Sequence, residues 1–390
     1  MICIIQNELR QSGFDLCHPI HTSWYNDLIR DEGLIESGAL NPLPDPPALI
    51  PVAYDDDGGE GGTTTTTTTS WFCNAVLIGN TKSAWPHFLR WLSSEVDRTR
   101  GAGEEGDDAA CDVPVDDDGA ALKRISNPFD SFVEMTIVRA MRRCCRRDDD
   151  DRSRMVGSCE IFWSDGGRTI IDVDDDRDAC YDDDCDRRRR VDDDDRDGND
   201  GRSFLVSMTR VATTTGEYWH DADATRLCVH PTYGTWTAFR AVVVFGTSRR
   251  GGSISPSPPP PPPPPRQRPV VSVEEIGIAK LAFEYALDAS SSNDGREGGG
   301  YGTTVGKPWA ELRDYLQHGS TCAGISWEKV PDAMKPWIRL RDCISVGRER
   351  WKYDDAQLLY HYTRDINVLS MELRRVRDDE RRGLIEGSVS

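Results

Sequence analysis

Apolar side chains recur at helical spacing in three segments of the chain. In residues 84–98 they return every three or four positions, which predicts one buried helix face. These positions are Phe88, Trp91, Leu92 and Val96. Residues 128–142 repeat the pattern behind a leading proline, a residue favoured in the first turn of a helix. Residues 356–377 predict one late helix.

Four other segments carry strand patterns. Residues 71–79 form a short apolar run that ends at a glycine, as a buried strand does. Residues 158–173 predict a hairpin, because two apolar runs flank an Asp-Gly turn. Residues 203–213 and 235–245 are further strand candidates. Strands and helices in mixed order, without strict alternation, predict an α+β fold.

Low-complexity sequence separates these segments. Four acidic stretches lie near residues 55–70, 101–119, 146–153 and 172–202, and together they account for the net charge of −20. Their low apolar content and high charge cannot offset the entropy of ordering, so we expect disordered acidic insertions. The remaining chain is close to neutral, and nothing in this charge pattern indicates a nucleic-acid ligand.

The ordered segments predict one domain with long insertions. We expect a core over residues 1–250, a polyproline linker over 251–269, a helical part over 270–378 that completes the binding cavity, and a tail over 379–390. The prolines at 258–265 predict an extended polyproline helix. Such a run is either a spacer or a ligand for an SH3-type or WW-type partner.

The cysteine pattern indicates a reducing compartment. Twelve cysteines lack the regular spacing of a disulfide framework and no convincing signal peptide precedes them, so a cytoplasmic protein is expected. Cys159, Cys180 and Cys185 lie near aspartates, but their spacing fits no zinc site and no metal held by the protein is expected. No apolar run is long enough to span a membrane.

The segment CVHPTYGTWTAFRAVVVF, residues 228–245, is more closely specified than its surroundings. The His-Pro pair forces an extended or turning backbone before a Tyr-Gly turn, and a strand follows. Arg240 lies in the middle of that otherwise apolar strand. Its guanidinium needs an anionic partner, which is either a core carboxylate or a ligand that bears a carboxylate or phosphate.

Four blocks of the chain resemble, in this order, the MMACHC (cblC) family of cobalamin-processing proteins. The blocks are GFDLCHPIHTSWYNDLI (13–29), WFCNAVLIGNTKSAWPHFLRWL (71–92), NPFDSFVEMTIVRAM (127–141) and CVHPTYGTWTAFRAVVVF. The resemblance implies a nitroreductase-like or flavin-reductase-like fold, a mixed sheet with flanking helices, whose cavity binds cobalamin base-off. None of the blocks is itself a catalytic signature.

The resemblance also implies an enzyme that removes the upper ligand of cobalamin. As a cyanocobalamin reductase it would expel cyanide with electrons from FMN or FAD, with NADPH as the indirect reductant. As an alkylcobalamin dealkylase it would transfer the alkyl group to the thiolate of glutathione. The product would pass to a trafficking partner of the MMADHC type and to methionine synthase. The cobalt centre carries the hard chemistry while the protein binds and orients.

Site residues follow from the resemblance, residue by residue. Arg240, Arg341 and Arg364 would hold the carboxylates of glutathione, with Arg313 as a rival to Arg341, and both helix arginines keep a solvated surface role as the alternative. The residues that would line the cobalamin or flavin cavity are Tyr218, Trp219, Cys228, His230, Trp236 and Trp351. Tyr218 and Trp219 keep a core role as the alternative, and His230 a role in the turn.

One departure from the family leaves other functions open. The family's His-Val-Ala-Gly segment is RVAT here, residues 210–213, so its histidine and glycine are missing. A carrier that binds cobalamin without catalysis is one alternative. A flavin-dependent reductase of the same fold that ignores corrins is another, and a bound yellow flavin would distinguish it.

Overall fold

The computed structural model of the protein describes residues 2–44, 73–101, 117–145, 158–172, 205–246, 262–265, 268, 271–291, 330, 332 and 334–382. The predicted insertions at 55–70 and 146–153 lie outside these residues, as do most of those at 101–119 and 172–202. The same holds for Cys180, Cys185 and Arg313.

A five-stranded sheet with the order β1-β2-β7-β3-β4 forms the centre of the fold. Its strands are β1 (Leu16–Ile20), β2 (Ala75–Asn80), β7 (Ala238–Gly246), β3 (Ser158–Trp163) and β4 (Arg168–Asp172). Every pairing among them is antiparallel, so the expectation of a mixed sheet was wrong. A short antiparallel pair, β5 (Trp219–His220) and β6 (Cys228–Val229), lies apart from this sheet.

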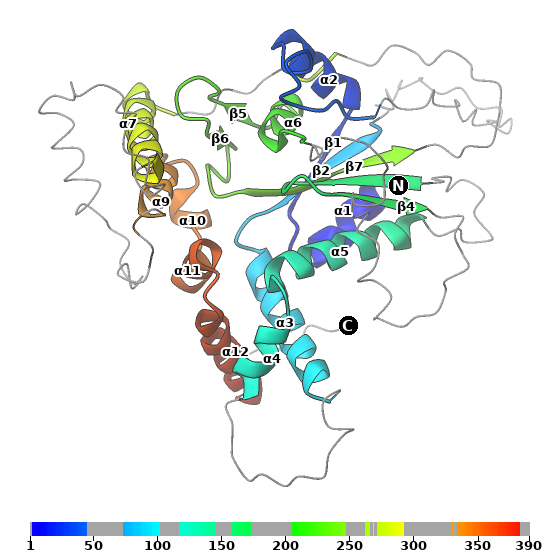
Figure 1. Cartoon of the computed structure of the whole chain (residues 1–390), viewed down its shortest axis with the longest axis vertical. Helices are drawn as coiled ribbons and strands as arrows, with labels where there is room; N and C mark the ends of the chain where they lie inside the picture. The colour runs from blue at the N-terminus through cyan, green and yellow to red at the C-terminus, as the bar shows by residue number, and fades with distance from the viewer. Residues whose placement is uncertain are drawn as a thin grey trace, which may run out of the picture.

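Helices cover both faces of the central sheet (Figure 1). One face packs on α1 (Ile2–Gln11), α3 (Ala84–Gly101) and α5 (Pro128–Cys145), and the other on α2 (Thr22–Asp31) and α6 (Met208–Thr214). The position of β7 between two helical layers explains why its sequence is a continuous apolar run. Ala241 and Val243 face the first layer while Val242 and Val244 face the second, so both sides of the strand are buried.

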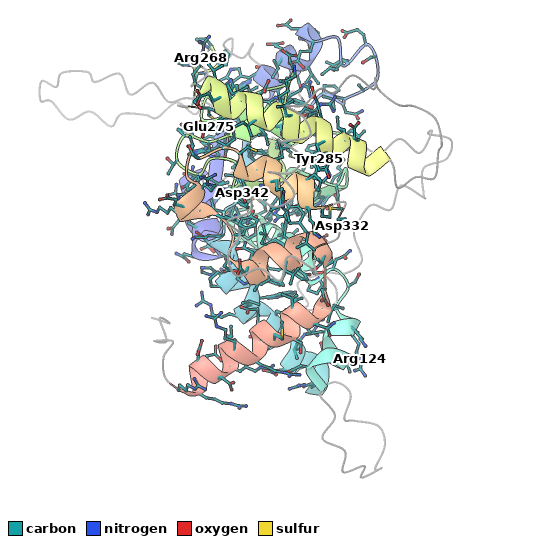
Figure 2. The ribbon with its side chains drawn as sticks, turned by 90° about the vertical axis from the view of Figure 1, so that its left-hand side faces the viewer. Arg124, Arg268, Glu275, Tyr285, Asp332 and Asp342 are labelled. Carbon is teal, nitrogen blue, oxygen red and sulfur yellow. The ribbon has the colours of Figure 1, made fainter. Side chains whose placement is uncertain are left out.

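The C-terminal helices continue from this core. They are α7 (Val273–Ser291), α9 (Lys335–Asp342), α10 (Arg348–Trp351), α11 (Asp355–Thr363) and α12 (Ile366–Arg381). Helix α7 lies against α9 along one side of the molecule (Figure 2). Glu275 joins the two, because its carboxylate accepts hydrogen bonds from the backbone N–H of Ser272 at the start of α7 and from that of Ser345 after α9.

Several predicted elements are confirmed with shifted ends. The helices expected at 84–98 and 128–142 are α3 and α5, and the hairpin expected at 158–173 is β3 and β4. The single late helix was wrong, because α11 ends where Arg364 adopts a left-handed conformation with φ of 56°. Asp365 then caps α12 by accepting a hydrogen bond from the N–H of Asn367.

The strand predicted at 203–213 was wrong, since its described part forms α6. Met208, Val211 and Ala212 are buried against the sheet and follow helical spacing. A run this short fits both the helical and the strand period, and its packing against the sheet determines that it forms a helix. The altered RVAT segment therefore lies on a helix, where Arg210 pairs at 2.6 Å with Glu32, the residue that follows α2.

The acidic stretch at 101–119 ends inside folded structure. Its last residues begin α4 (Asp117–Arg124), and the Asp118 residue is only 8% exposed. Two arginines neutralise that carboxylate, which is why it lies in the folded part and not in a solvated loop.

Part of the polyproline run contacts the core. Gly216, which follows α6, has φ of +76°, and a Cβ atom there would come within 2.9 Å of Pro264 Cβ. At this point the run packs on the fold and does not act only as a spacer. Among the described helices, none combines the length and the apolar character needed to cross a membrane.

Candidate functional site

Arg240 owes its orientation to an irregularity in the sheet. Ile78 of β2 pairs with Ala241 of β7, whereas the next residue, Gly79, pairs with Phe239. Arg240 is therefore the extra residue of a β-bulge, a feature that bends a strand and re-aims a side chain. The guanidinium points to the layer of α5, where it lies 4.8 Å from the centre of the Phe129 ring.

Most of the hydrogen-bonding capacity of Arg240 is unused. Its Nε donates to Asn80 Oδ1 at 2.7 Å, and within the described residues the guanidinium makes no other hydrogen bond and no ion pair. Burial lowers the pKa of Arg240, and the nearby Arg364 and Arg341 lower it further. An arginine stays protonated even so. A partly buried cation with unused donors is a natural partner for an anionic ligand.

Arg341 is more firmly engaged. From α9, its Nε and Nη2 donate to the backbone oxygen of Thr235 at 3.0 and 2.7 Å, and Thr235 Oγ1 donates back to the oxygen of Arg341. Its guanidinium carbon lies 4.5 Å from the Trp236 ring centre and 5.1 Å from that of Tyr353. Arg341 thus fastens α9 to the segment that enters β7.

Arg364 reaches the same place from the end of α11. Its Nη2 lies 3.6 Å from Asp130 Oδ2 near the start of α5, and its guanidinium carbon lies 5.8 Å from the Tyr360 ring centre. The side chain is 46% exposed, so this ion pair is weak and can exchange for a ligand.

His361 lies within electrostatic range of all three arginines. Its ring packs edge-on against Tyr353 at 5.7 Å and Tyr362 at 4.9 Å. Burial holds the pKa of His361 well below its usual value, and Arg341, Arg240 and Arg364 lower it further, so the ring is neutral at pH 7. We call Arg240, Arg341, Arg364 and His361 the arginine cluster.

Sequence reasoning missed the residues that complete this cluster. Asn80 ends an apolar strand and Asp130 lies in the first turn of a helix, both ordinary structural positions. His361 precedes Arg364 in YHYTRD, and a lone histidine in an amphipathic helix gives no separate signal. Only the fold brings these residues beside Arg240.

The predicted cavity residues do not form one lining. Tyr218 is fully buried, and its ring meets His230 at 5.0 Å, Phe239 at 5.1 Å and His18 at 5.4 Å. Trp236 is also fully buried, beneath Arg341. Trp219 is half-buried and packs with the residues between β6, α7 and α9.

Burial also determines the protonation of the histidines next to Tyr218 and of Cys228. It lowers the pKa of both His18 and His230 to about 4, with Arg10 adding to the effect on His18 and His18 to that on His230. Burial raises the pKa of the Cys228 thiol well above its usual value. These side chains are therefore uncharged at neutral pH, as expected for a packed interior.

Specific contacts of the His-Pro-Thr-Tyr-Gly turn explain why its sequence is so closely specified. Nδ1 of His230 accepts hydrogen bonds from the backbone N–H groups of Thr232 and Tyr233 at 3.0 and 3.3 Å. Gly234, with φ of 60°, lies directly against the backbone oxygen of Val346 in the turn between α9 and α10. The structural role considered for His230 is what these contacts describe.

Trp351, the last predicted cavity residue, belongs to the same junction. Its ring lies edge-on to Tyr233 at 4.7 Å, and the guanidinium carbon of Arg350 lies 5.0 Å from its centre. Trp351 and Trp236 thus join the segment between β6 and β7 to the C-terminal helices, next to the arginine cluster.

Comparisons with known proteins found matches among solved structures. No protein-family profile and no curated protein matches the chain. The crystal structure of CblC, a B12-trafficking protein of C. elegans described as a homologue of human MMACHC, aligns with 80% of this chain and 94% of its own. The TM-score is 0.37 and the sequence identity 16%. The chain is thus similar, at this modest level, to a member of the family that its four sequence blocks resemble.

Proposed function

We propose that this protein is a cobalamin-processing enzyme that binds cobalamin base-off and transfers its upper alkyl group to glutathione. The observation that carries the proposal is the arginine cluster. The three arginines that the resemblance assigned to glutathione come from β7, α9 and the end of α11, yet all three act electrostatically on one histidine, His361.

The charges of the cluster suit a dicarboxylate. Among the described residues, the three guanidinium groups have one carboxylate partner, that of Asp130, which binds Arg364 only weakly at 3.6 Å. Glutathione brings two carboxylates, and charge-assisted hydrogen bonds from arginine are among the strongest polar contacts in proteins. Arg240 and Arg364 keep donors available for such a ligand, while Arg341 spends most of its donors on holding the site together.

The proposed chemistry needs position more than acid or base catalysis. The glutathione thiolate attacks the carbon bound to cobalt, the C–S bond forms, and the Co–C bond breaks with its electron pair left on cobalt. Cobalamin is the substrate of this step. Fixing both carboxylates of glutathione holds the sulfur on one line of approach, which turns an encounter between two molecules into a local event. The positive cluster also favours the thiolate over the thiol.

Reductive removal of cyanide would need a flavin, and the described residues do not fit one at the predicted positions. The rings of Tyr218 and Trp236 are fully buried and offer no face for a flavin to stack on. We therefore assign no step to FMN or FAD. Decyanation, the use of NADPH and delivery to downstream partners extend the proposal on the sequence resemblance alone.

The test is the visible absorption spectrum of the full chain with methylcobalamin, before and after glutathione is added without oxygen. A change to the base-off spectrum, followed by reduced cobalamin and S-methylglutathione, is the expected result. Base-off binding without product would leave a carrier, and no spectral change on mixing would contradict the cobalamin proposal.

A further inference from the structure

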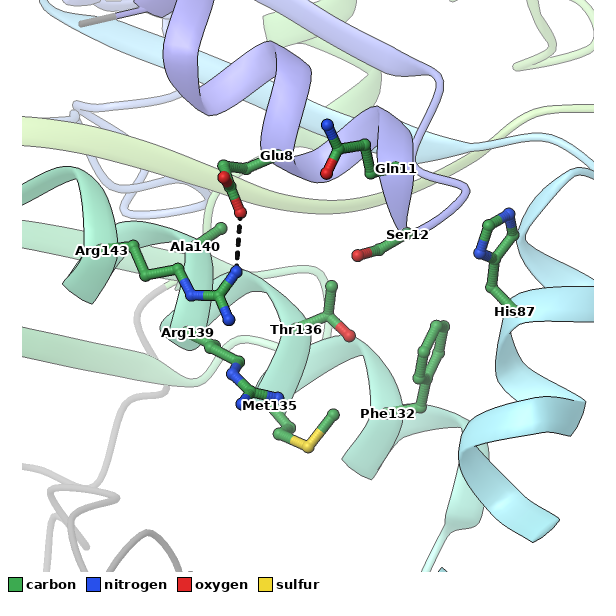
Figure 3. A pocket seen from close by; sticks show the side chains of 10 residues that line it. All are labelled: Glu8, Gln11, Ser12, His87, Phe132, Met135, Thr136, Arg139, Ala140 and Arg143. Carbon is green, nitrogen blue, oxygen red and sulfur yellow. Dashed lines mark hydrogen bonds and ion pairs between the residues drawn. The ribbon is translucent and has the colours of Figure 1, made fainter. Parts of the chain in front are cut away.

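A second polar site lies where α5 meets α1 and α3. A pocket of about 200 Å³ opens between α1, α3 and α5 (Figure 3). Its volume is well above the roughly 10–15 Å³ that a single water requires and below that of the usual drug-sized pocket. The residues that line it are Glu8, Gln11, Ser12, His87, Phe132, Met135, Thr136, Arg139, Ala140 and Arg143.

Helical spacing makes this pocket a built feature of the packing. On α5 its lining falls at positions 132, 135, 136, 139, 140 and 143, which is one continuous helix stripe. On α1 and the turn after it, positions 8, 11 and 12 face that stripe. His87 closes the end from α3, and Phe132 and Met135 provide an apolar wall (Figure 3).

Four polar side chains of the pocket, Thr136, Ser12, Gln11 and Arg139, lack partners among the described residues. Thr136 is 7% exposed, lines the pocket and makes no side-chain hydrogen bond with any described residue. Across the described chain, the Ser12 hydroxyl and the Gln11 amide likewise have none, and Arg139 has neither a hydrogen bond nor an ion pair. Because the Thr136 hydroxyl lines the pocket and has no partner in the described chain, its donor is available to a ligand.

The charge of the pocket is positive. Arg143 is paired with Glu8 at 3.0 Å, which leaves Arg139 as a net cation at the rim. His87 stays neutral, because burial and the nearby Arg90 lower its pKa. Arg90 can only donate to His87 Nδ1, at 3.3 Å, so the proton of the neutral ring resides on Nε2. The pocket therefore presents hydroxyl, amide and guanidinium donors and one net positive charge.

We propose that the pocket between α1 and α5 binds a small oxyanion, a phosphate or carboxylate group carried on a compact molecule. Arg139 supplies the charge, while the hydroxyls of Thr136 and Ser12 supply donors from opposite walls. Phe132 and Met135 contact the apolar part of the ligand. This site is separate from the arginine cluster, which lies at the N-terminal end of α5 around Asp130.

Titration calorimetry of the full chain with inorganic phosphate and with acetate, at constant ionic strength, tests the proposal. We expect saturable binding that weakens about tenfold or more in Arg139→Ala and about fivefold in Thr136→Val. Arg142→Ala, the same charge change one residue from Arg143 and outside the lining, should leave the affinity within about twofold. Tighter binding of phosphate would indicate a phosphate ester as the ligand, and tighter binding of acetate a carboxylate.

Two outcomes would overturn the site. One is a heat of titration no different from that of chloride at equal ionic strength. The other is saturable binding that survives in Thr136→Val and Arg139→Ala but disappears in Arg240→Ala, because the anion then occupies the arginine cluster. Neither outcome depends on whether the protein dealkylates cobalamin, so this test stands apart from the test of the proposed function.

Discussion

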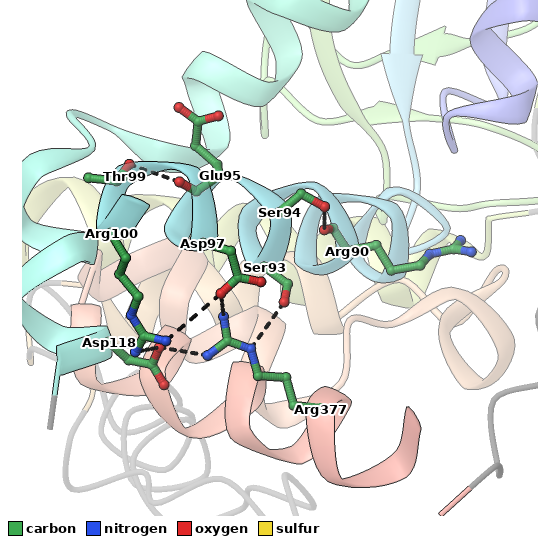
Figure 4. Close-up of polar contacts among 9 residues, drawn as sticks. All are labelled: Arg90, Ser93, Ser94, Glu95, Asp97, Thr99, Arg100, Asp118 and Arg377. Atoms are coloured by element: carbon green, nitrogen blue, oxygen red, sulfur yellow. Dashed lines mark hydrogen bonds and ion pairs between the residues drawn. The ribbon is translucent and has the colours of Figure 1, made fainter. Parts of the chain in front are cut away.

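Two groups of arginines in this protein differ in how completely they are neutralised. Where α12 meets α3 and α4, Arg100 and Arg377 share Asp118, and Arg377 also binds Asp97 (Figure 4). The distances are 2.5 to 2.7 Å, and two cations face two carboxylates. Within the described part of the chain, the three cations of the arginine cluster have one carboxylate partner, Asp130, at the longer distance of 3.6 Å.

We call the first group, Arg100, Arg377, Asp97 and Asp118, the clamp, because its ion pairs hold helices together. The arginine cluster has the unused donors of a binding site. Arg377 also donates to Ser93 Oγ, so its three nitrogens all have partners and α12 is tied to α3 and α4. Arg240 has one partner, Asn80, and lies in a layer of aromatic rings. A closely paired ion network stabilises the fold, whereas a partly buried cation with unused donors is stabilised by a ligand that accepts from them.

The largest effect on stability should come from Asp118→Ala, which removes the carboxylate that both arginines of the clamp share. Because the aspartate side chain is 11% exposed and two cations lose their partner, we expect a loss of about 2–3 kcal/mol. That corresponds to a fall in Tm of about 5–10 °C by calorimetry. Asp97→Ala is the control, since this side chain is 62% exposed and should lose less than about 1 kcal/mol. Equal losses would show that the clamp does not depend on Asp118.

Arg341→Ala should lower both the stability of the fold and the use of glutathione. It removes two hydrogen bonds to the oxygen of Thr235 and the cation stacked on Trp236, so we expect about 2 kcal/mol of lost stability. Glutathione use should fall as well. Loss of glutathione use at an unchanged Tm would contradict the fastening role given to Arg341.

Arg240→Ala, in contrast, should lower glutathione use with little change in Tm. One lost charge-assisted contact to a carboxylate predicts a fall of about 10–100-fold in kcat/KM for glutathione. Arg240→Lys should recover only part of it, because lysine lacks the planar fork. The binding of methylcobalamin, followed by its base-off spectrum, serves as the control. An equal loss of cobalamin binding would remove the role assigned to this arginine.

The smallest effect is a pH dependence that belongs to His361. Its pKa is below 6.5 in the folded protein and near 6.5 in the unfolded chain, so the unfolded chain binds more protons as the pH falls below 6.5. Stability is therefore retained above pH 6.5 and lost as the pH drops. Between pH 7.5 and 5.0 we expect His361→Phe to lose about 1 kcal/mol less than the original chain in urea unfolding.

A glutathione-like dicarboxylate should reduce that pH dependence. Its carboxylates would offset Arg240, Arg341 and Arg364, raise the pKa of His361 and let the folded protein bind the proton too. His18 and His230, whose pKa values are also lowered, contribute to the slope in both proteins, so only the difference reports on His361. An unchanged difference with ligand present would argue that the ligand binds elsewhere.

Long periodic segments were predictable from sequence because their pattern repeats several times. The α3 and α5 helices and the β3–β4 hairpin followed in this way. The segment of α6 is only seven residues long, and Met208, Val211 and Ala212 fit a helix or a strand until they are packed on the sheet. Asp118 looked like solvated filler because the arginines that bury it, Arg100 and Arg377, lie far away in the chain.

The candidate site shows the same limit. Arg240 was identifiable because a cation within an apolar strand requires a partner wherever the strand lies. Its direction could not be predicted, since it depends on a bulge between β7 and β2, and Arg240 and Asn80 of these strands lie 160 positions apart in the chain. His361 and Asp130 carry no signal in their own segments.

The sequence by itself determined the α+β composition, the positions of the low-complexity insertions, the main helices and the arginines that are candidates for ligand binding. Those properties follow from local pattern and composition, which each segment holds alone. The tertiary structure decided which arginines are saturated and which are not, because neutralisation depends on carboxylates brought from other segments. It also decided that Tyr218 and Trp236 are enclosed and that Thr136 faces a pocket, since burial belongs to the packed layers and not to any one helix or strand.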